Sequence, residues 1–71
     1  MNNTFIINHT DPINRLLTEL WNDNGREIPW DDFLISLDNN IEMVQYDAGN
    51  WRTFIWFHTE EGKIMFLLKW L

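Results

Sequence analysis

The sequence predicts an α+β fold, a two-layer sandwich in which helices pack on an antiparallel sheet. An apolar stripe with helical spacing follows Pro12, whereas the chain from Ile41 onwards is rich in β-branched and aromatic residues. The expected order is a short N-terminal strand, two helices and then a three-stranded antiparallel meander (β-α-α-β-β-β). With 71 residues, the chain is long enough for a single small domain, residues 1–71.

The first strand and the first helix are expected near the N-terminus. The segment Thr4–Asn8 is apolar and short, which favours a strand at an edge of the sheet. Asp11 and Pro12 then predict a helix start, because aspartate can cap free N–H groups and proline fits the first helical position. The apolar residues of this helix form one stripe: Ile13, Leu16, Leu17, Leu20 and Trp21. Gly25, or the asparagine before it, is expected to end the helix in the left-handed conformation.

A second helix is predicted to begin around Pro29 and to end at residues 38–40. Asp31 and Asp32 in its first turn would complement the helix dipole. Its apolar residues again share one side: Trp30, Phe33, Leu34 and Leu37. The alternative is a strand over residues 33–37 that turns directly into the next strand. We favour the helix, since proline and paired acids are uncommon in strands.

The rest of the chain is predicted to form the meander. Its strands would occupy three ranges: residues 41–46, 51–58 and 64–71. Each connecting segment ends in a glycine, Gly49 in the first and Gly62 in the second. A glycine at the third position of a three-residue loop suits a type I turn closed by a left-handed residue. Such a loop at Gly49 would pair Tyr46 with Asn50.

Both faces of this meander would be apolar. Phe54 and Trp56 would lie on one face, and Ile55 and Phe57 on the other. Two helices with about 20 residues in total can cover only one face, and we expect them to take the more aromatic one, that of Phe54 and Trp56. The other face would then bind a second copy of the chain or another protein. The predicted oligomer interface is Trp51, Ile55, Phe57 and Leu67.

The chain is acidic. It has eleven Asp and Glu residues against five Lys and Arg residues, and its net charge is −6. This balance argues against direct binding to nucleic acid or to an anionic membrane, both of which attract clustered basic residues. It favours a protein partner with a basic surface. The N-terminal residues lack the basic start and long apolar run of a signal peptide, so the expected location is the cytoplasm.

No set of residues predicts catalysis, a metal site or a cofactor site, and we expect that the protein is not an enzyme. His9 and His58 each lie near carboxylates in the sequence, but neither has an evident partner that would make it a general base. Asp31 and Asp32 fit a helix start better than a cation site, which needs oxygens at alternating positions of a loop. There is no cysteine to form a disulfide or a thiolate site. The five tryptophans are expected mainly to supply buried area to a small core.

The distribution of acids leads to the predicted function. The predicted partner-binding patch has two acidic parts: Asp23, Glu27, Asp31 and Asp32 around the helices, and then Glu60 and Glu61. We therefore expect a small non-enzymatic interaction protein that binds and inhibits a macromolecular partner, as phage-type inhibitors and immunity proteins do, with a surface that imitates nucleic acid. The alternative is a structural or regulatory homo-oligomer, such as a homodimer, that assembles through the apolar sheet face. A third hypothesis, a nucleic-acid-binding module with exposed tryptophans, is disfavoured by the shortage of basic residues.

Overall fold

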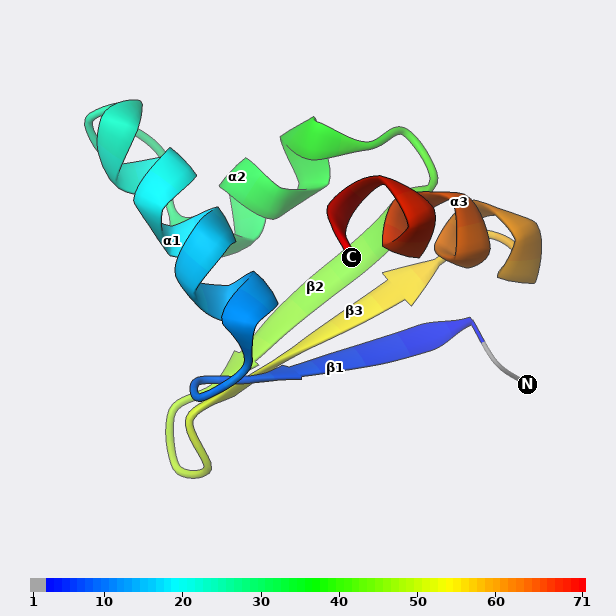
Figure 1. Cartoon of the computed structure of the whole chain (residues 1–71), viewed down its shortest axis with the longest axis horizontal. Coiled ribbons are helices and arrows are strands. Elements are labelled where there is room, and N and C mark those ends of the chain that lie inside the picture. The colour runs from blue at the N-terminus through cyan, green and yellow to red at the C-terminus, as the bar shows by residue number, and fades with distance from the viewer. Residues whose placement is uncertain (1–2) are drawn as a thin grey trace.

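The computed structural model describes residues 3–71 and confirms the predicted α+β class. The elements are, in chain order, β1 (Thr4–Asn8), α1 (Pro12–Asp23), α2 (Trp30–Leu37), β2 (Ile41–Asp47), β3 (Arg52–Phe57) and α3 (Glu60–Trp70). The strands form one antiparallel sheet in the order β1-β3-β2, and the helices pack on one face of it around a common core (Figure 1). Within residues 3–71, no helix has the length and apolarity that crossing a lipid bilayer requires.

The first helix begins where the sequence predicts. Pro12 is its first residue, and Ile13 and Leu17 from its apolar stripe are buried in the core. Asp11 does not cap the helix, contrary to the prediction, because its carboxylate accepts a hydrogen bond from the backbone N–H of the last residue of β1 at 2.9 Å. That bond closes the turn between β1 and α1. Gly25 follows the helix with φ of 78°, the left-handed conformation expected there.

The second helix is also confirmed, and residues 33–37 belong to it rather than to a strand. Phe33 and Leu34 are buried in the core. Asp31 and Asp32 lie in the first turn, where carboxylates offset the positive end of the helix dipole. The helical spacing of the apolar residues was therefore the correct basis for predicting this segment.

The third strand of the predicted meander is wrong, because residues 60–70 form the helix α3. Thr59 is its N-cap, and the Thr59 hydroxyl accepts a hydrogen bond from the backbone N–H of Gly62 at 3.0 Å. Two acids in the first turn and Lys69 in the last turn complement the helix dipole. Apart from Ile64, the apolar residues of the segment are not β-branched, and its leucines and methionine are good helix formers. The place beside β3 that this strand was expected to take is occupied by β1.

Gly62 is required for close packing and not for a turn. It is buried in the first turn of α3, and a Cβ atom at this position would lie 2.7 Å from the Cβ of Asn40. The turn before β2 therefore approaches the backbone of α3 too closely for a side chain at Gly62.

The β2–β3 hairpin differs from the predicted register by three positions, since Tyr46 pairs with Thr53 rather than with Asn50. The loop consists of residues 48–51. Gly49 is not its left-handed residue; Trp51 instead adopts φ of 55°. Because side chains alternate along a strand, a shift by an odd number of residues exchanges the faces of one strand relative to the other.

The predicted choice of the covered face is wrong as well. Ile55 and Phe57, which were expected at an oligomer interface, are 0% and 1% exposed and lie in the core of their own chain. Phe54 and Trp56 point to the opposite face, where their rings stack with centroids 5.7 Å apart. Within the described residues no helix covers this opposite face (Figure 1). We refer to it as the open sheet face, and its residues are Ile6, Met43, Gln45, Arg52, Phe54 and Trp56. One apolar face thus remains uncovered, as the sequence predicts, although it is not the face expected.

Replacing Gly62 tests the close approach of α3 to Asn40. Alanine is the better helix former by roughly 1 kcal/mol, so propensity alone predicts that Gly62→Ala raises the free energy of unfolding. We expect the opposite. Gly62→Ala should lower the free energy of unfolding by about 1 kcal/mol or more, because the added methyl group meets the Cβ of Asn40. Thermal unfolding followed by circular dichroism measures the change. The control is Gly49→Ala, where the added Cβ would be 3.5 Å from the nearest Asp47 oxygen and should be tolerated; a higher Tm for Gly62→Ala would contradict the packing argument.

Candidate functional site

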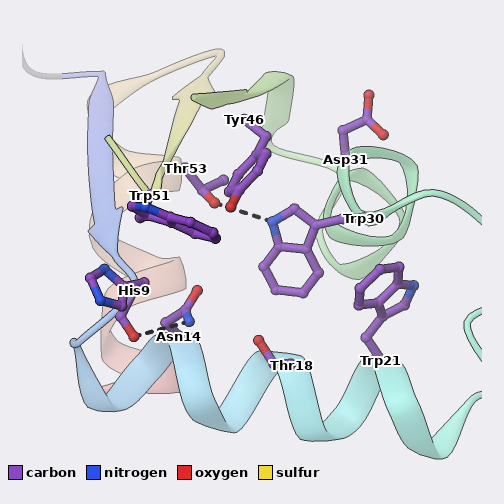
Figure 2. A pocket seen from close by; sticks show the side chains of 9 residues that line it. All are labelled: His9, Asn14, Thr18, Trp21, Trp30, Asp31, Tyr46, Trp51 and Thr53. Carbon is purple, nitrogen blue, oxygen red and sulfur yellow. Dashed lines mark hydrogen bonds between the residues drawn. The ribbon is translucent and has the colours of Figure 1, made fainter. Parts of the chain in front are cut away.

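A cleft of about 610 Å³ lies beside the β2–β3 loop, between α1 and the start of α2 (Figure 2). Its aromatic lining consists of Trp21, Trp30, Tyr46, Trp51 and the imidazole of His9. Its polar lining consists of Asn14, Thr18, Asp31 and Thr53. Figure 2 shows Asn14 and Thr18 projecting from α1 toward the rings of Trp30, Tyr46 and Trp51. We refer to this site as the aromatic cleft.

Trp30 forms a fixed wall of the aromatic cleft. It is the first residue of α2, and its indole N–H donates a hydrogen bond to the hydroxyl of Thr53 at 3.1 Å. Thr53 is 1% exposed and lies on β3, so this bond ties the start of α2 to the central strand. Trp21 packs on the same ring with centroids 5.3 Å apart, and its own N–H donates to the carbonyl of Ile28 at 2.9 Å. Both indoles are therefore held in place without a ligand.

Trp51 forms the facing wall, and it does so in an unfavourable backbone conformation. Its φ of 55° is uncommon for any residue with a side chain and exceptional for a bulky one. The ring is 59% exposed, so little burial compensates the strain. Its backbone carbonyl accepts a hydrogen bond from the N–H of His9 at 2.9 Å, and the two rings lie 6.1 Å apart. Strain of this kind concentrates at functional sites and makes Trp51 a candidate for function.

Asp47 organises the loop that carries Trp51. Its Oδ2 accepts hydrogen bonds from the side-chain amide of Asn50 at 2.9 Å and from Nε of Arg52 at 3.3 Å. The hydrogen bond from Asn50, with a further contribution from Arg52, holds the pKa of Asp47 below its usual value. The carboxylate is therefore ionised at neutral pH and fixes both ends of the turn.

The charge of the aromatic cleft is negative. Asp31 lies at its rim, and none of the described residues that line it is Lys or Arg. Arg26 instead lies over the ring of Trp21 at 4.5 Å from the centroid, and it is not among the lining residues. Of the other predicted acids, Glu27 lines a smaller hollow of about 230 Å³ that also includes Trp21.

The six acids predicted to form the partner-binding patch do not lie together. Asp23 and Asp32 are exposed on α1 and α2, like Glu27 on the connector between them. Glu60 and Glu61 are exposed in the first turn of α3 and not at a hairpin tip. Figure 1 places the start of α3 and the end of α1 at opposite ends of the molecule. The acidic residues thus form two separate groups, and only the first group is near the aromatic cleft.

The aromatic cleft combines one residue from each of the two predicted sets, Asp31 from the acidic patch and Trp51 from the oligomer interface. Leu67 is elsewhere, half-buried on α3 against the core. Sequence reasoning did not select the other aromatic members of the cleft, because aromatic residues are equally expected in a core: Trp21, Trp30 and Tyr46. No sequence signal marked the loop position of Trp51, because the β-branched and aromatic run that predicts the strand begins at that residue.

The arrangement is suited to binding through aromatic faces, apolar contact and charge. Among residues 3–71, no three side chains of His, Asp or Glu come together as metal ligands would. His58 follows β3 and does not line the cleft, so the two histidines do not share a site.

No known protein family, curated protein or solved structure shows significant similarity to this chain. The geometry and the charge of the chain itself are therefore the basis for assigning a function.

Comparing Gly and Ala at position 51 tests the strain in the loop. Both Trp51→Ala and Trp51→Gly remove the ring, so the difference between them reports the backbone alone. Glycine normally destabilises relative to alanine by about 0.5–1 kcal/mol, but at φ of 55° we expect Trp51→Gly to be the more stable variant by about 1 kcal/mol. Urea unfolding of the two proteins measures the difference. At Ala48, which is not among the left-handed residues, Ala48→Gly should show the normal order; the same order at position 51 would remove the case for strain.

Proposed function

We propose that this chain is a small acidic binding protein that attaches to a basic surface of a protein partner and blocks it. The observation that carries the proposal is the aromatic cleft, whose lining joins large aromatic rings to the carboxylate of Asp31 and, in the described residues, includes no Lys or Arg. Aromatic side chains that meet in a pocket are frequent anchors of protein interfaces. The net charge of −6 supports attraction to a basic partner over the distance of an encounter.

Further acids lie around the aromatic cleft and would face the same basic surface of the partner. Asp23, Glu27 and Asp32 are exposed on the segment that also supplies Trp21 and Trp30. Proteins that bind nucleic acid carry basic surfaces, so such a protein is the class of partner that an acidic inhibitor of the phage or immunity type would block. In this proposal the protein imitates nucleic acid by its charge, performs no reaction and works in the cytoplasm.

Reversing two charges beside the aromatic cleft tests the proposal. The tagged wild-type chain is first used to capture proteins from its host extract, and the captured protein is purified. We expect Glu27→Lys/Asp32→Lys to weaken the complex by roughly tenfold, since exposed ion pairs contribute up to about 1 kcal/mol each. The dependence of affinity on salt should also become flatter, because fewer opposite charges meet in the interface. Titration calorimetry at several salt concentrations measures both.

The control reverses the distant acidic group, Glu60→Lys/Glu61→Lys, which makes the same change of charge and places two lysines in the first turn of α3, against one in the first turn of α2 for the test variant. This control should bind like the wild type. Equal losses for the two double variants, or no loss for either, would contradict a binding surface at the aromatic cleft. If the captured protein binds nucleic acid, the complex should prevent that binding.

A second candidate function, assembly with copies of itself, is favoured by the outer side of α3. Four apolar side chains follow one another along this side, and each is more than half exposed: Ile64, Met65, Leu68 and Leu71. An exposed apolar stripe on a helix is typical of helix–helix interfaces. In an antiparallel pair of α3 helices, Glu61 in the first turn of one copy would approach Lys69 in the last turn of the other.

Light scattering after size-exclusion chromatography tests assembly through α3. We expect the wild-type chain to form a dimer that dissociates on dilution, and Leu68→Glu to be monomeric because it buries a charge in the interface. The control is Met43→Glu, which places the same charge on the open sheet face and should leave the dimer intact. A wild-type monomer at every concentration would exclude this second function.

A further inference from the structure

We infer that the aromatic cleft is a binding site for an organic cation, namely the ammonium or guanidinium head of a lysine or arginine side chain, methylated forms included. The inference rests on the proposed function, because a basic protein partner would supply that side chain. The cationic head would contact the rings of Trp30, Tyr46 and Trp51. Asp31 lies at the rim, where its Oδ1 accepts a hydrogen bond from the backbone N–H of Asp32 at 3.0 Å and Figure 2 shows its carboxylate turned away from the rings, so it would act through its charge and not by contact.

Aromatic rings from three separate elements meet at the cleft. The face of an indole or phenol ring is negative, and a cation over that face is attracted, most strongly by tryptophan. Trp30 comes from α2, Tyr46 from β2 and Trp51 from the loop between β2 and β3, and Figure 2 shows the three rings around one opening. Rings from separate elements that meet at one space can contact a single cationic head from several sides.

The ring of Trp30 is positioned before a ligand binds, and the rings of Trp51 and Tyr46 are open to an incoming ligand. Trp30 is held by its hydrogen bond to Thr53 at 3.1 Å. Trp51 is held in the left-handed conformation and remains 59% exposed, and Tyr46 is 48% exposed although it lies on the covered side of the sheet. A ring that is already held, as that of Trp30 is, loses little freedom when a ligand binds, which is a property of a preformed recognition site.

The charge of the cleft also favours a cation. Asp31 stands at its rim, and the described lining includes no Lys or Arg; the imidazole of His9, which also lines the cleft, lies 6.1 Å from the ring of Trp51. The chain places its own cations over other aromatic faces: Arg26 over Trp21, which itself lines the cleft, at 4.5 Å, Arg52 over Phe54 at 5.0 Å and Lys69 over Trp70 at 5.4 Å. The rings of Trp30, Tyr46 and Trp51 face the cleft without such a partner within the described residues. A cation from another molecule would supply it.

A nucleobase or a sugar could also stack on these rings, and the test has to separate such ligands from a cation. A phosphate group beside a base would meet Asp31 and a chain of net charge −6, which disfavours a nucleotide. A neutral ligand would gain the apolar contact but not the attraction between the cation and the rings.

The experiment compares choline with its neutral carbon isostere, in which a quaternary carbon replaces the nitrogen. The two have nearly the same shape and differ in charge. Binding is followed by nuclear magnetic resonance of the indole N–H groups, where the signals of Trp30 and Trp51 should move and that of Trp56, on the open sheet face, should not. We expect choline to bind about tenfold more tightly than the isostere.

A second arm identifies the source of the cation. Short peptides with a central lysine, trimethyllysine or arginine are titrated beside one with citrulline, the neutral counterpart of arginine. If the ligand is a side chain of a partner, the cationic peptides should bind at least as tightly as choline, and the citrulline peptide should bind roughly tenfold more weakly than the arginine peptide. Binding of choline without binding of the peptides would assign the cleft to a free small cation and would overturn the side-chain assignment.

Variants confirm the location. Trp51→Gly retains a backbone that suits the turn and should weaken choline binding by roughly fivefold or more. Asp31→Asn should weaken it about threefold, because a rim carboxylate acts through partly solvated space. Asp32→Asn is the matched control, since Asp32 follows Asp31 in the same turn but does not line the cleft, and it should bind choline like the wild type.

Equal binding of choline and its isostere, binding of a nucleoside monophosphate in preference to both, or no binding of any cation would each overturn the cation site. These results are distinguishable from a failure of the proposed function. A salt-dependent complex that weakens with Glu27→Lys/Asp32→Lys while all cations fail to bind would retain the proposed function and reject the cation site. Binding of cationic peptides without any partner complex would retain the cation site and reject the proposed function.

Discussion

The hydrogen bond from Trp30 to Thr53 joins the start of α2 to the centre of the sheet, and α3 packs on the same central strand. Thr53 is the first of the side chains on β3 that face the helices, followed by Ile55 and Phe57. The ring of Phe57 packs on Phe66 of α3 with centroids 5.3 Å apart. Because β3 pairs with both other strands, its covered face lies in the middle of the layer. The alternation of side chains along this one strand therefore determines where α2 and α3 attach and where the aromatic cleft has its polar inner wall.

Helical periodicity in the sequence was a sound guide for α1 and α2 and failed for α3. An apolar stripe identifies a helix only when the opposite side is polar, and α3 has Phe66 in the core while Leu68 is exposed to solvent. A short continuous apolar run fits a buried strand as well as a helix, so the pattern of this segment did not separate the two. The information that did so was local: Thr59 followed by two acids is a helix start, although Gly62 drew attention to a turn.

The hairpin register links the wrong interface to the missed cleft. In the predicted register Tyr46 would share a face with Phe54, whereas in the structure it lies opposite Thr53, on the side of the helices. The rule that glycine takes the left-handed position of a loop led to Gly49, yet the loop uses Trp51. Turn preferences describe which residue adopts a given backbone conformation at the lowest energy. They therefore do not predict a loop that holds a bulky residue in a strained conformation. Asp31 and Trp51 were each recognisable in the sequence, but their meeting depends on packing between distant segments.

The tryptophans lie at the margin of the core and not inside it. The sequence suggests that they supply the core. The fully buried apolar residues of the described chain are aliphatic side chains and phenylalanine, and Trp21, Trp30 and Trp70 pack against them partly buried. Three of them, from α1, α2 and the loop, line one cavity. Trp51 is the extreme case, because its backbone conformation costs on the order of 1–3 kcal/mol while its ring gains little burial. Trp21 and Trp30 also line the aromatic cleft. The strain at Trp51 would be offset if a ligand that enters this cleft buried the Trp51 ring.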